Sequence, residues 1–305
     1  MDKPYGGIQV KKSNIVWVIG DGILKILACG DIHYPREEAL FFNFLRFIEK
    51  EKPDLIILCG DILNYANIHN LDKFLRKIHR RAKTRIVAVM GNHDFWIIRK
   101  NRKTGESWGL IAAYSKALCK YGDILLWDKP YIHDDFIIVG IPGWYDFSYA
   151  PFELGFRWED FMRGSLGGEY WNDFRYVSFE KDPEEVTRIH LEKLREQLNK
   201  ISPNRTTMVI LHFIPLRNFL VYNGDPYHDY WNAYSGSSKL GDLVLSANVG
   251  ISRVFFGHHS YKKLARKKLV VNNVVFESVD ISKGIEAAVL MEIYLEWGVS
   301  CFSWC

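Results

Sequence analysis

Three almost uninterrupted apolar runs in the first third of the chain constrain the fold more than any other feature. They cover residues 23–29, 55–59 and 86–90 and alternate with helix-like stretches near residues 36–50, 71–81 and 108–120. Continuous apolar runs are typical of parallel strands that are buried on both faces. The repeated strand and helix order therefore predicts an α/β fold in which helices cover a parallel sheet.

The rest of the chain predicts more strands and one well-marked helix. Strand-like runs occur at 124–127, 137–141, 207–212, 253–256 and 269–278, with a further candidate at 287–296. The segment 183–200 has Asp182 as a candidate N-cap and Pro183 in its first turn, which predicts a helix. Asp21 and Gly22 separate the runs 14–19 and 23–29, so a hairpin is expected there. Because no linker-like stretch is evident, we expect one domain over 1–305, with residues 1–22 as an added hairpin strand.

Aromatic residues make up 15% of the chain and concentrate in two segments without a clear period, 144–179 and 214–238. We interpret both as long insertions that follow strands. Their rings could form a cup for an apolar or stackable part of a substrate. Alternatively, they could form a satellite core that stabilises the insertions themselves. The sequence leaves these two interpretations open.

Composition narrows the class of protein only coarsely. A net charge of +4 on 305 residues does not by itself indicate a nucleic-acid-binding protein. Basic clusters at 73–103 and 262–268 fit either a phosphate-rich partner or a solvated helix face and turn, and we favour the second. The five cysteines form no C-x-x-C pair, and no apolar stretch is long enough for a transmembrane helix. We therefore expect a cytoplasmic protein; its oligomeric state is not predicted.

Polar residues recur where the predicted strands end. The sequence reads D-I-H at 31–33, G-D-I-L-N at 60–64, G-N-H-D at 91–94, L-H at 211–212 and G-H-H-S at 257–260. Ligands of open α/β sheets bind at the carboxyl ends of strands, so these groups are expected to face one crevice. Two cages of oxygen and nitrogen ligands that share the carboxylate of Asp61 would hold two divalent ions. Such mixed ligands suit Mn, with Fe, Zn or Ni as alternatives, better than Mg.

This order of motifs resembles the calcineurin-like metallophosphoesterase superfamily from Asp31 to His258. The resemblance implies a four-layer αββα sandwich of two mixed sheets flanked by helices. It also implies a phosphoric ester hydrolase in which a metal-bridging hydroxide attacks the ester. The residues that it implies are Asp31, His33 and Asp61 for one metal, Asp61, Asn92, His212 and His258 for the other, His93 as general acid, and the Asn64 side chain as the group that orients His93.

The last motif departs from the family pattern. The family usually has a histidine ligand at the position that Ser260 occupies here, and a serine hydroxyl is a poor ligand for a transition metal. His259 could replace that ligand only if its loop rearranged, because neighbouring residues of an extended segment point to opposite sides. The departure predicts a weaker first metal site.

The expected activity is hydrolysis of a phosphomonoester or a phosphodiester, with a substrate that can carry an aromatic or apolar group. A nuclease is one alternative, although nucleic acid is not the favoured partner. A second alternative is a non-catalytic binding scaffold with a degraded metal site, for which Ser260 is the one supporting feature.

Overall fold

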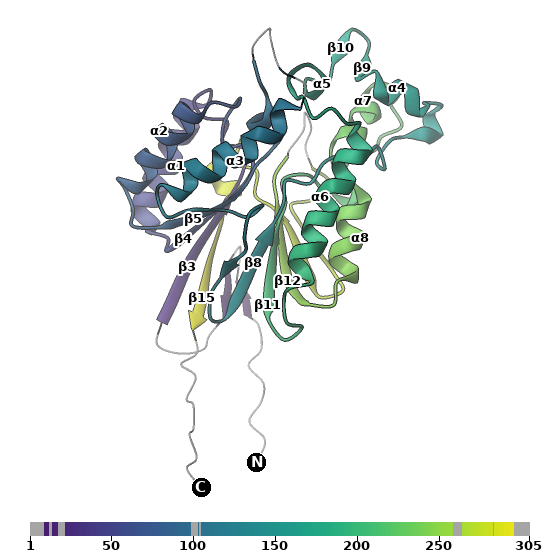
Figure 1. Ribbon diagram of the computed structural model, residues 1–305. Helices are drawn as coiled ribbons and strands as arrows, with labels where there is room; N and C mark the ends of the chain where they lie inside the picture. Colours follow the sequence, from purple (N-terminus) through teal and green to yellow (C-terminus); the bar gives the residue numbers. More distant parts are fainter. Residues whose placement is uncertain are drawn as a thin grey trace, which may run out of the picture.

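Two mixed β-sheets packed face to face form the centre of the molecule, and helices cover their outer faces (Figure 1). The computed structural model describes residues 9–11, 14–17, 22–98, 103, 105–258, 264–282 and 284–295. Within these ranges, the order of layers confirms the αββα sandwich expected from the sequence. No helix in the described ranges is both long and apolar enough to cross a bilayer.

The first sheet has the order β1-β2-β15-β3-β4-β5-β6. Its strands are β1 (Gln9–Lys11), β2 (Asn14–Trp17), β3 (Gly22–Cys29), β4 (Leu55–Cys59), β5 (Arg85–Val89), β6 (Ile124–Leu125) and β15 (Val289–Leu295). Strands β3 to β6 run parallel to one another, and β15 is antiparallel to β3. Helices α1 (Glu38–Glu51), α2 (Ile68–His79) and α3 (Glu106–Cys119) lie on its outer face (Figure 1).

The second sheet has the order β13-β14-β12-β11-β8-β7. Its strands are β7 (Tyr131–Ile132), β8 (Phe136–Gly140), β11 (Thr206–Ile210), β12 (Gly250–Phe256), β13 (Lys268–Val271) and β14 (Val274–Ser278). Helices α6 (Pro183–Leu198) and α8 (Ser238–Ser246) cover it, and Asp182 caps α6 as predicted by accepting from the Glu185 main-chain N–H.

Successive side chains of a strand point alternately to the two faces of a sheet, and in these strands both sets are apolar. On β4, Ile57 and Cys59 belong to the cluster between the sheets, together with Ile138 of β8 and Phe255 of β12. The intervening Leu58 belongs to the larger cluster under the helices. Successive side chains of a strand point to opposite faces, so a run without polar residues is buried on both sides.

One predicted hairpin and one predicted strand are wrong. The expected hairpin between residues 14–19 and 23–29 does not form, because β15 lies between β2 and β3 and pairs with β3 from Gly22 to Ala28. Long pairing with an apolar strand outweighs a local turn signal; β2 pairs instead with β1 and β15. The single strand expected at 269–278 is the hairpin β13–β14, whose Asn272 and Asn273 both have the positive φ of a type I′ turn.

The two aromatic segments lie together at one end of the sandwich (Figure 1). They contain short elements only: η2 (Phe152–Leu154), α4 (Trp158–Met162), β9 (Ser165–Leu166), β10 (Glu169–Tyr170), α5 (Asp173–Tyr176), η3 (Arg217–Phe219), α7 (Pro226–Tyr230) and η4 (Trp231–Tyr234). Phe161 is fully buried against rings from both segments, including Phe147, Tyr230 and Tyr234. Rings of both segments thus pack together, as the satellite-core interpretation expects, although they join the larger cluster under the helices and do not form a separate one.

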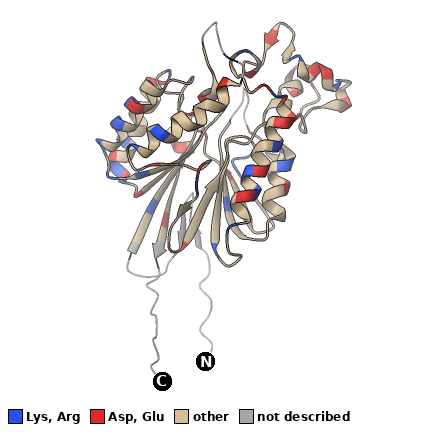
Figure 2. Ribbon diagram, viewed as in Figure 1, with Lys and Arg blue, Asp and Glu red and all other residues tan. Residues whose placement is uncertain are grey.

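The charged residues lie mainly on the outer helices (Figure 2). Arg76 of α2 forms an ion pair with Asp72 of the same helix, and Lys120, directly after α3, pairs with the same carboxylate. The ammonium group of Lys77 lies 5.2 Å from the Tyr34 ring centroid. This part of the basic cluster is thus a helix face with its own partners. Residues 99–102 and 262–263 of the clusters lie outside the described ranges.

Candidate metal centre

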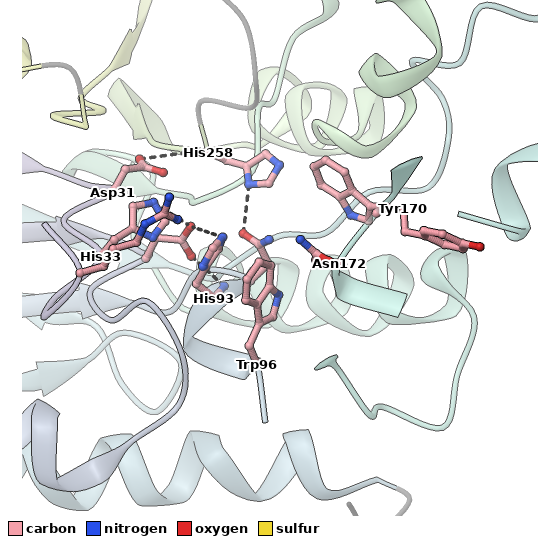
Figure 3. A pocket seen from close by; sticks show the side chains of 11 residues that line it. Asp31, His33, His93, Trp96, Tyr170, Asn172 and His258 are labelled. Atoms are coloured by element: carbon pink, nitrogen blue, oxygen red, sulfur yellow. Dashed lines mark hydrogen bonds and ion pairs between the residues drawn. The ribbon is translucent and has the colours of Figure 1, made fainter. Parts of the chain in front are cut away.

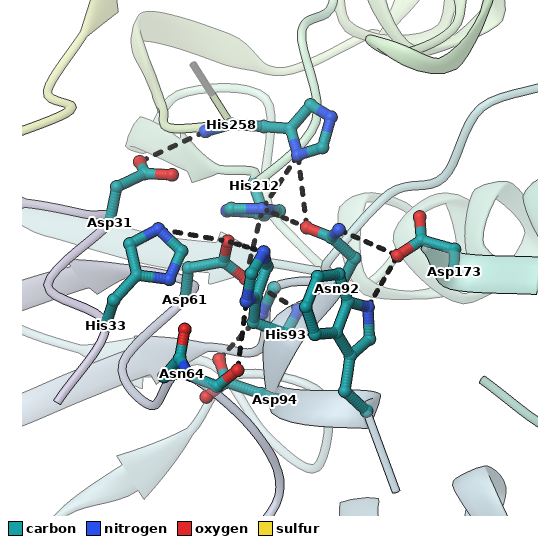
Figure 4. Close-up of polar contacts among 12 residues, drawn as sticks. Asp31, His33, Asp61, Asn64, Asn92, His93, Asp94, Asp173, His212 and His258 are labelled. Atoms are coloured by element: carbon teal, nitrogen blue, oxygen red, sulfur yellow. Dashed lines mark hydrogen bonds and ion pairs between the residues drawn. The ribbon is translucent and has the colours of Figure 1, made fainter. Parts of the chain in front are cut away.

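Six of the predicted ligand positions follow five strands whose carboxyl ends meet at one edge of the sandwich. Asp31 and His33 follow β3, Asp61 follows β4, and Asn92 precedes η1 (His93–Phe95) after β5. His212 and His258 follow β11 and β12 of the other sheet. Figure 4 shows these side chains converging from both sheets. Parallel strands present their carboxyl ends on one side, which is why residues so distant in sequence meet.

The backbone at these strand ends is unusual. Asp31, His33, Asp61 and His258 have φ values of 59°, 50°, 48° and 54°, in the left-handed region that non-glycine residues seldom adopt. Such conformations persist only where the surroundings hold them, and they cluster at functional sites. Here they turn each side chain back toward the shared cavity.

Asp61 occupies the middle of the site. Its Oδ1 lies 3.4 Å from His212 Nε2 and accepts a 2.9 Å hydrogen bond from the His93 main-chain N–H. Its Oδ2 lies 3.7 Å from His33 Nε2 and 3.9 Å from His93 Nε2. One oxygen thus faces the residues from the second sheet, and the other faces the histidines of the first. The carboxylate is placed as a bridging ligand requires.

Main-chain carbonyls determine which nitrogen of each imidazole carries a proton. His212 Nδ1 lies 2.8 Å from the Cys59 carbonyl, and His258 Nε2 lies 3.2 Å from the Tyr234 carbonyl. A carbonyl oxygen can only accept, so both of these nitrogens must be donors. In the neutral rings, His212 Nε2 and His258 Nδ1 then carry lone pairs, the arrangement found in metal-ligating histidines.

Those lone pairs converge on the oxygen of Asn92. His212 Nε2, His258 Nδ1 and Asn92 Oδ1 are each 3.1 Å from the other two. The amide end of Asn92 is turned away, because Nδ2 donates to Asp173 Oδ1 at 2.8 Å. A cation between these three atoms would be bound by two imidazole nitrogens and one amide oxygen, so this donor set fits a metal ion.

Burial makes the site electrostatically suited to a cation. Burial lowers the pKa of His33 to about 4 and holds the pKa of His212 well below its usual value, so both imidazoles are neutral. Burial, and then the charge of Asp31, holds the pKa of Asp61 well above its usual range. A divalent ion would relieve the repulsion between the two carboxylates and would accept the neutral imidazoles as ligands.

The potential ligand atoms form two groups, and within each group all atoms lie within 4.8 Å of one another. One group is His33, Asp61 and His93; the other is Asp31, Asp61 and His212. Asp31 Oδ2 also accepts from the His258 main-chain N–H at 3.1 Å. The structure therefore brings together every ligand that the sequence predicts among the described residues. His259 and Ser260 lie outside those residues.

The contact between His93 and Asn64 differs from the expectation. His93 Nδ1 lies 3.0 Å from the main-chain carbonyl of Asn64, whereas the side-chain Oδ1 of Asn64 is buried without a hydrogen-bond partner among the described residues. The turn after β4 places the carbonyl, not the side chain, against the imidazole. Since the carbonyl must accept, His93 Nδ1 donates and Nε2 faces Asp61.

Two buried carboxylates support the site, and sequence reasoning assigned no role to either. Asp94 accepts from the main-chain N–H groups of Ile62, Leu63 and Gly91, so it ties the ends of β4 and β5 together. It belongs to the G-N-H-D motif, which could have identified it. Asp173 shares its aromatic segment with Asp146 and Asp160, and no spacing in the sequence distinguishes it from them.

The site opens into a cavity of about 380 Å³ (Figure 3). The candidate ligands form one part of its wall, and the aromatic segment 144–179 contributes to another. The lining residues outside the candidate ligands and His93 are Arg36, Trp96, Tyr170, Trp171 and Asn172. Both interpretations of the aromatic segments thus have a structural basis, because a few rings line the cavity while others pack together.

Comparisons with known proteins agree with this geometry. The sequence model of the calcineurin-like phosphoesterase family matches residues 24–260. Among solved structures, the phosphopantetheinyl hydrolase from Mycobacterium tuberculosis is similar in fold, with a TM-score of 0.65 at 17% identity over 86% of this chain and 90% of that one. A dimetal phosphatase from Danio rerio has a TM-score of 0.51 at 13% identity, covering 90% and 94% of the two chains. No curated protein matches the sequence.

Proposed function

The chain belongs to the calcineurin-like phosphoesterase family and is a phosphoric ester hydrolase, and we propose that it acts with two divalent metal ions held in the strand-end cavity. By the family pattern, Asp31, His33 and Asp61 would hold one ion, whereas by distance His33 groups with Asp61 and His93, and Asp31 groups with Asp61 and His212. Asp61 would also contribute to the other, together with Asn92, His212 and His258. Mn²⁺ is the first choice, since carboxylate, amide and imidazole ligands occur together.

One observation carries this proposal more than any other. His212 Nε2, His258 Nδ1 and Asn92 Oδ1 face one another at 3.1 Å, and each is an acceptor because its other polar atom is engaged as a donor. Two imidazole nitrogens and an amide oxygen that face one point are a donor set suited to a divalent transition-metal ion. When bound, the two ions supply Lewis-acid polarisation of the phosphoryl oxygen and lower the pKa of water.

His93 is the residue that we propose as general acid toward the leaving oxygen. The Asn64 carbonyl holds its Nδ1 at 3.0 Å, and the Trp96 ring stacks against its imidazole at a centroid distance of 3.5 Å. These two contacts fix the plane of the ring and leave Nε2 on the cavity side. Because Nδ1 already donates to the carbonyl, the acid must be the imidazolium form, with a second proton on Nε2. Burial holds the pKa of His93 well below its usual value, so the negative charge of a bound phosphate ester would have to stabilise that form. A positioned acid of this kind contributes roughly 10²–10⁴-fold to rate.

The non-ligand wall of the cavity supports a substrate with more than a bare phosphate. Arg36 supplies a cation, Asn172 supplies hydrogen-bonding groups, and Tyr170 and Trp171 supply apolar surface. The similar M. tuberculosis protein is a phosphopantetheinyl hydrolase, which makes a phosphopantetheinylated carrier protein a useful test substrate. A choice between monoesters and diesters requires assays of both.

The test is hydrolysis by Mn²⁺-loaded protein of alkyl and nitrophenyl esters, both mono- and diesters, with single-stranded nucleic acid and a phosphopantetheinylated carrier protein in the same panel. For His93→Asn, we expect kcat for alkyl esters to fall about 10²–10⁴-fold. The loss should be much smaller for nitrophenyl esters, because their leaving groups need little protonation.

The same variant should bind Mn²⁺ with an affinity close to that of the wild type, measured by isothermal titration. If His93→Asn lowers kcat equally for good and poor leaving groups, His93 is not the acid. If the substitution also lowers the Mn²⁺ affinity, His93 is a metal ligand. Absence of hydrolysis of every ester by protein that contains two metals would refute the enzymatic proposal.

A further inference from the structure

One carboxylate from the first aromatic segment contacts the candidate metal centre. Asp173 opens α5 and is only 2% exposed. Its Oδ1 accepts from Asn92 Nδ2 at 2.8 Å (Figure 4). The same oxygen accepts from Trp96 Nε1 at 2.6 Å, and Oδ2 accepts from Trp171 Nε1 at 2.8 Å. Three side-chain N–H groups from two parts of the chain therefore meet at this carboxylate.

The side chain of Asn92 has two chemically different ends of nearly the same shape. Only Oδ1 can bind a cation, and only Nδ2 can donate. In the structure, Nδ2 faces Asp173 and Oδ1 faces His212 and His258. If the amide turned over, its oxygen would face the Asp173 carboxylate, and its N–H groups would point at the position where a metal would bind.

We propose that Asp173 is a positioning residue for the metal centre: it fixes the Asn92 amide so that the oxygen faces the metal position, and it holds Trp96 against His93. An ionised carboxylate can only accept hydrogen bonds, so it selects one of the two amide orientations. This inference builds on the proposed metal site, and it links the 144–179 segment to the chemistry of the strand ends.

Trp96 extends the same effect to the proposed acid. Its indole N–H is held by Asp173, and its ring lies at 26° to the His93 imidazole. Asn92 and His93 are neighbours at the end of β5, so one carboxylate restrains both side chains from the opposite side of the cavity. Partners that orient metal ligands in this way commonly affect metal affinity by roughly 10–100-fold.

The test is a double-mutant cycle of isosteric substitutions, with Mn²⁺ affinity measured by isothermal titration at one fixed pH. As a single substitution, Asp173→Asn should change the Mn²⁺ affinity by no more than about threefold, because the amide oxygen of the new asparagine can still accept from Asn92 and Trp96. Asn92→Asp places a second carboxylate against Asp173. Adding Asp173→Asn to that variant supplies an N–H donor and should raise its affinity about tenfold or more.

Trp171→Phe is the matched control, because it removes one hydrogen bond to Asp173 without changing the side chain that faces Asn92. It should give the same small change in the wild-type and Asn92→Asp backgrounds. If Asp173→Asn also acts equally in both backgrounds, the carboxylate does not orient the amide and the inference is overturned.

The measurement needs no substrate, so its outcome is independent of the hydrolysis assay. Non-additive Mn²⁺ affinities in a protein that hydrolyses none of the esters would support the positioning role and refute the proposed function. Additive Mn²⁺ affinities in a protein that hydrolyses the esters would support the proposed function and overturn the positioning role. Chemical unfolding of each metal-free variant checks that the fold is retained.

Discussion

Close packing around the Asp61 carboxylate explains why glycine precedes Asn92. A Cβ added to Gly91 would lie 2.2 Å from Asp61 Oδ1, 2.4 Å from the Asp61 main-chain nitrogen and 2.7 Å from His212 Cε1. Real Cβ atoms do not approach other atoms so closely. Gly91 is thus required by the geometry of the bridging carboxylate, and not by a turn.

Gly91→Ala should therefore displace Asp61 or His212 and weaken Mn²⁺ binding at least about tenfold, as loss of ligand orientation does elsewhere. Gly109→Ala is the matched control, because Gly109 lies inside α3 with nothing within 4 Å of the added Cβ. That control should retain Mn²⁺ affinity and gain about 0.5–1 kcal/mol of unfolding free energy. Equal Mn²⁺ affinities for the two variants would contradict the steric argument.

The candidate ligands could be predicted because each follows a strand in a short motif. D-I-H, G-D, G-N-H-D and the later histidines all stand where an apolar run ends. Asp173 could not be predicted, because nothing in its spacing sets it apart from the other two aspartates of the same aromatic segment. The Asn64 contact was assigned to the wrong group, since a motif specifies the residue but not whether its carbonyl or its side chain points inward.

At the scale of elements, long apolar runs predicted most strands of the two sheets, while pairing was harder to predict. The hairpin β13–β14 depends on two asparagines with positive φ in the middle of an apolar run. The place of β15 beside β3 depends on contacts between opposite ends of the sequence. Local patterns identify a strand, but they do not identify its neighbour.

The two aromatic segments form one packed unit, and the structure predicts how it responds to truncation. Phe161 is fully buried, and its neighbours Tyr230 and Tyr234 donate hydrogen bonds to the Asp160 and Phe161 carbonyls. Phe161→Ala should lower the unfolding free energy by about 3–5 kcal/mol, measured by urea unfolding of the metal-free protein.

Phe152→Ala is the comparison for this measurement, because Phe152 contacts the same ring but is 46% exposed. Its cost should stay below about 1 kcal/mol, as expected for a largely solvated side chain. Similar costs for the two variants would mean that the rings act as a loose surface cover and not as a packed core.

For the whole molecule, the candidate metal centre lies where the two sheets meet. The first sheet positions Asp31, His33, Asp61 and Asn92, whereas the second positions His212 and His258. The apolar cluster between the sheets holds the two sets of ligands together. The helices bury the outer face of each sheet. The strand-end motifs suggested a shared crevice, but the division of ligands between two sheets follows from the sheet order, which no local pattern reveals.

Metal binding should consequently stabilise the sandwich as a unit. A ligand that binds only the folded state adds RT ln(1 + [L]/Kd), about 2.7 kcal/mol when free Mn²⁺ is 100 times Kd. We expect the thermal midpoint of the wild-type protein to rise with Mn²⁺ concentration along this logarithmic dependence. Asp61→Asn weakens both ligand sets, so its midpoint should rise far less over the same concentrations. A wild-type midpoint that does not change with Mn²⁺, or an equal rise for Asp61→Asn, would show that the ion does not bind between the sheets through Asp61.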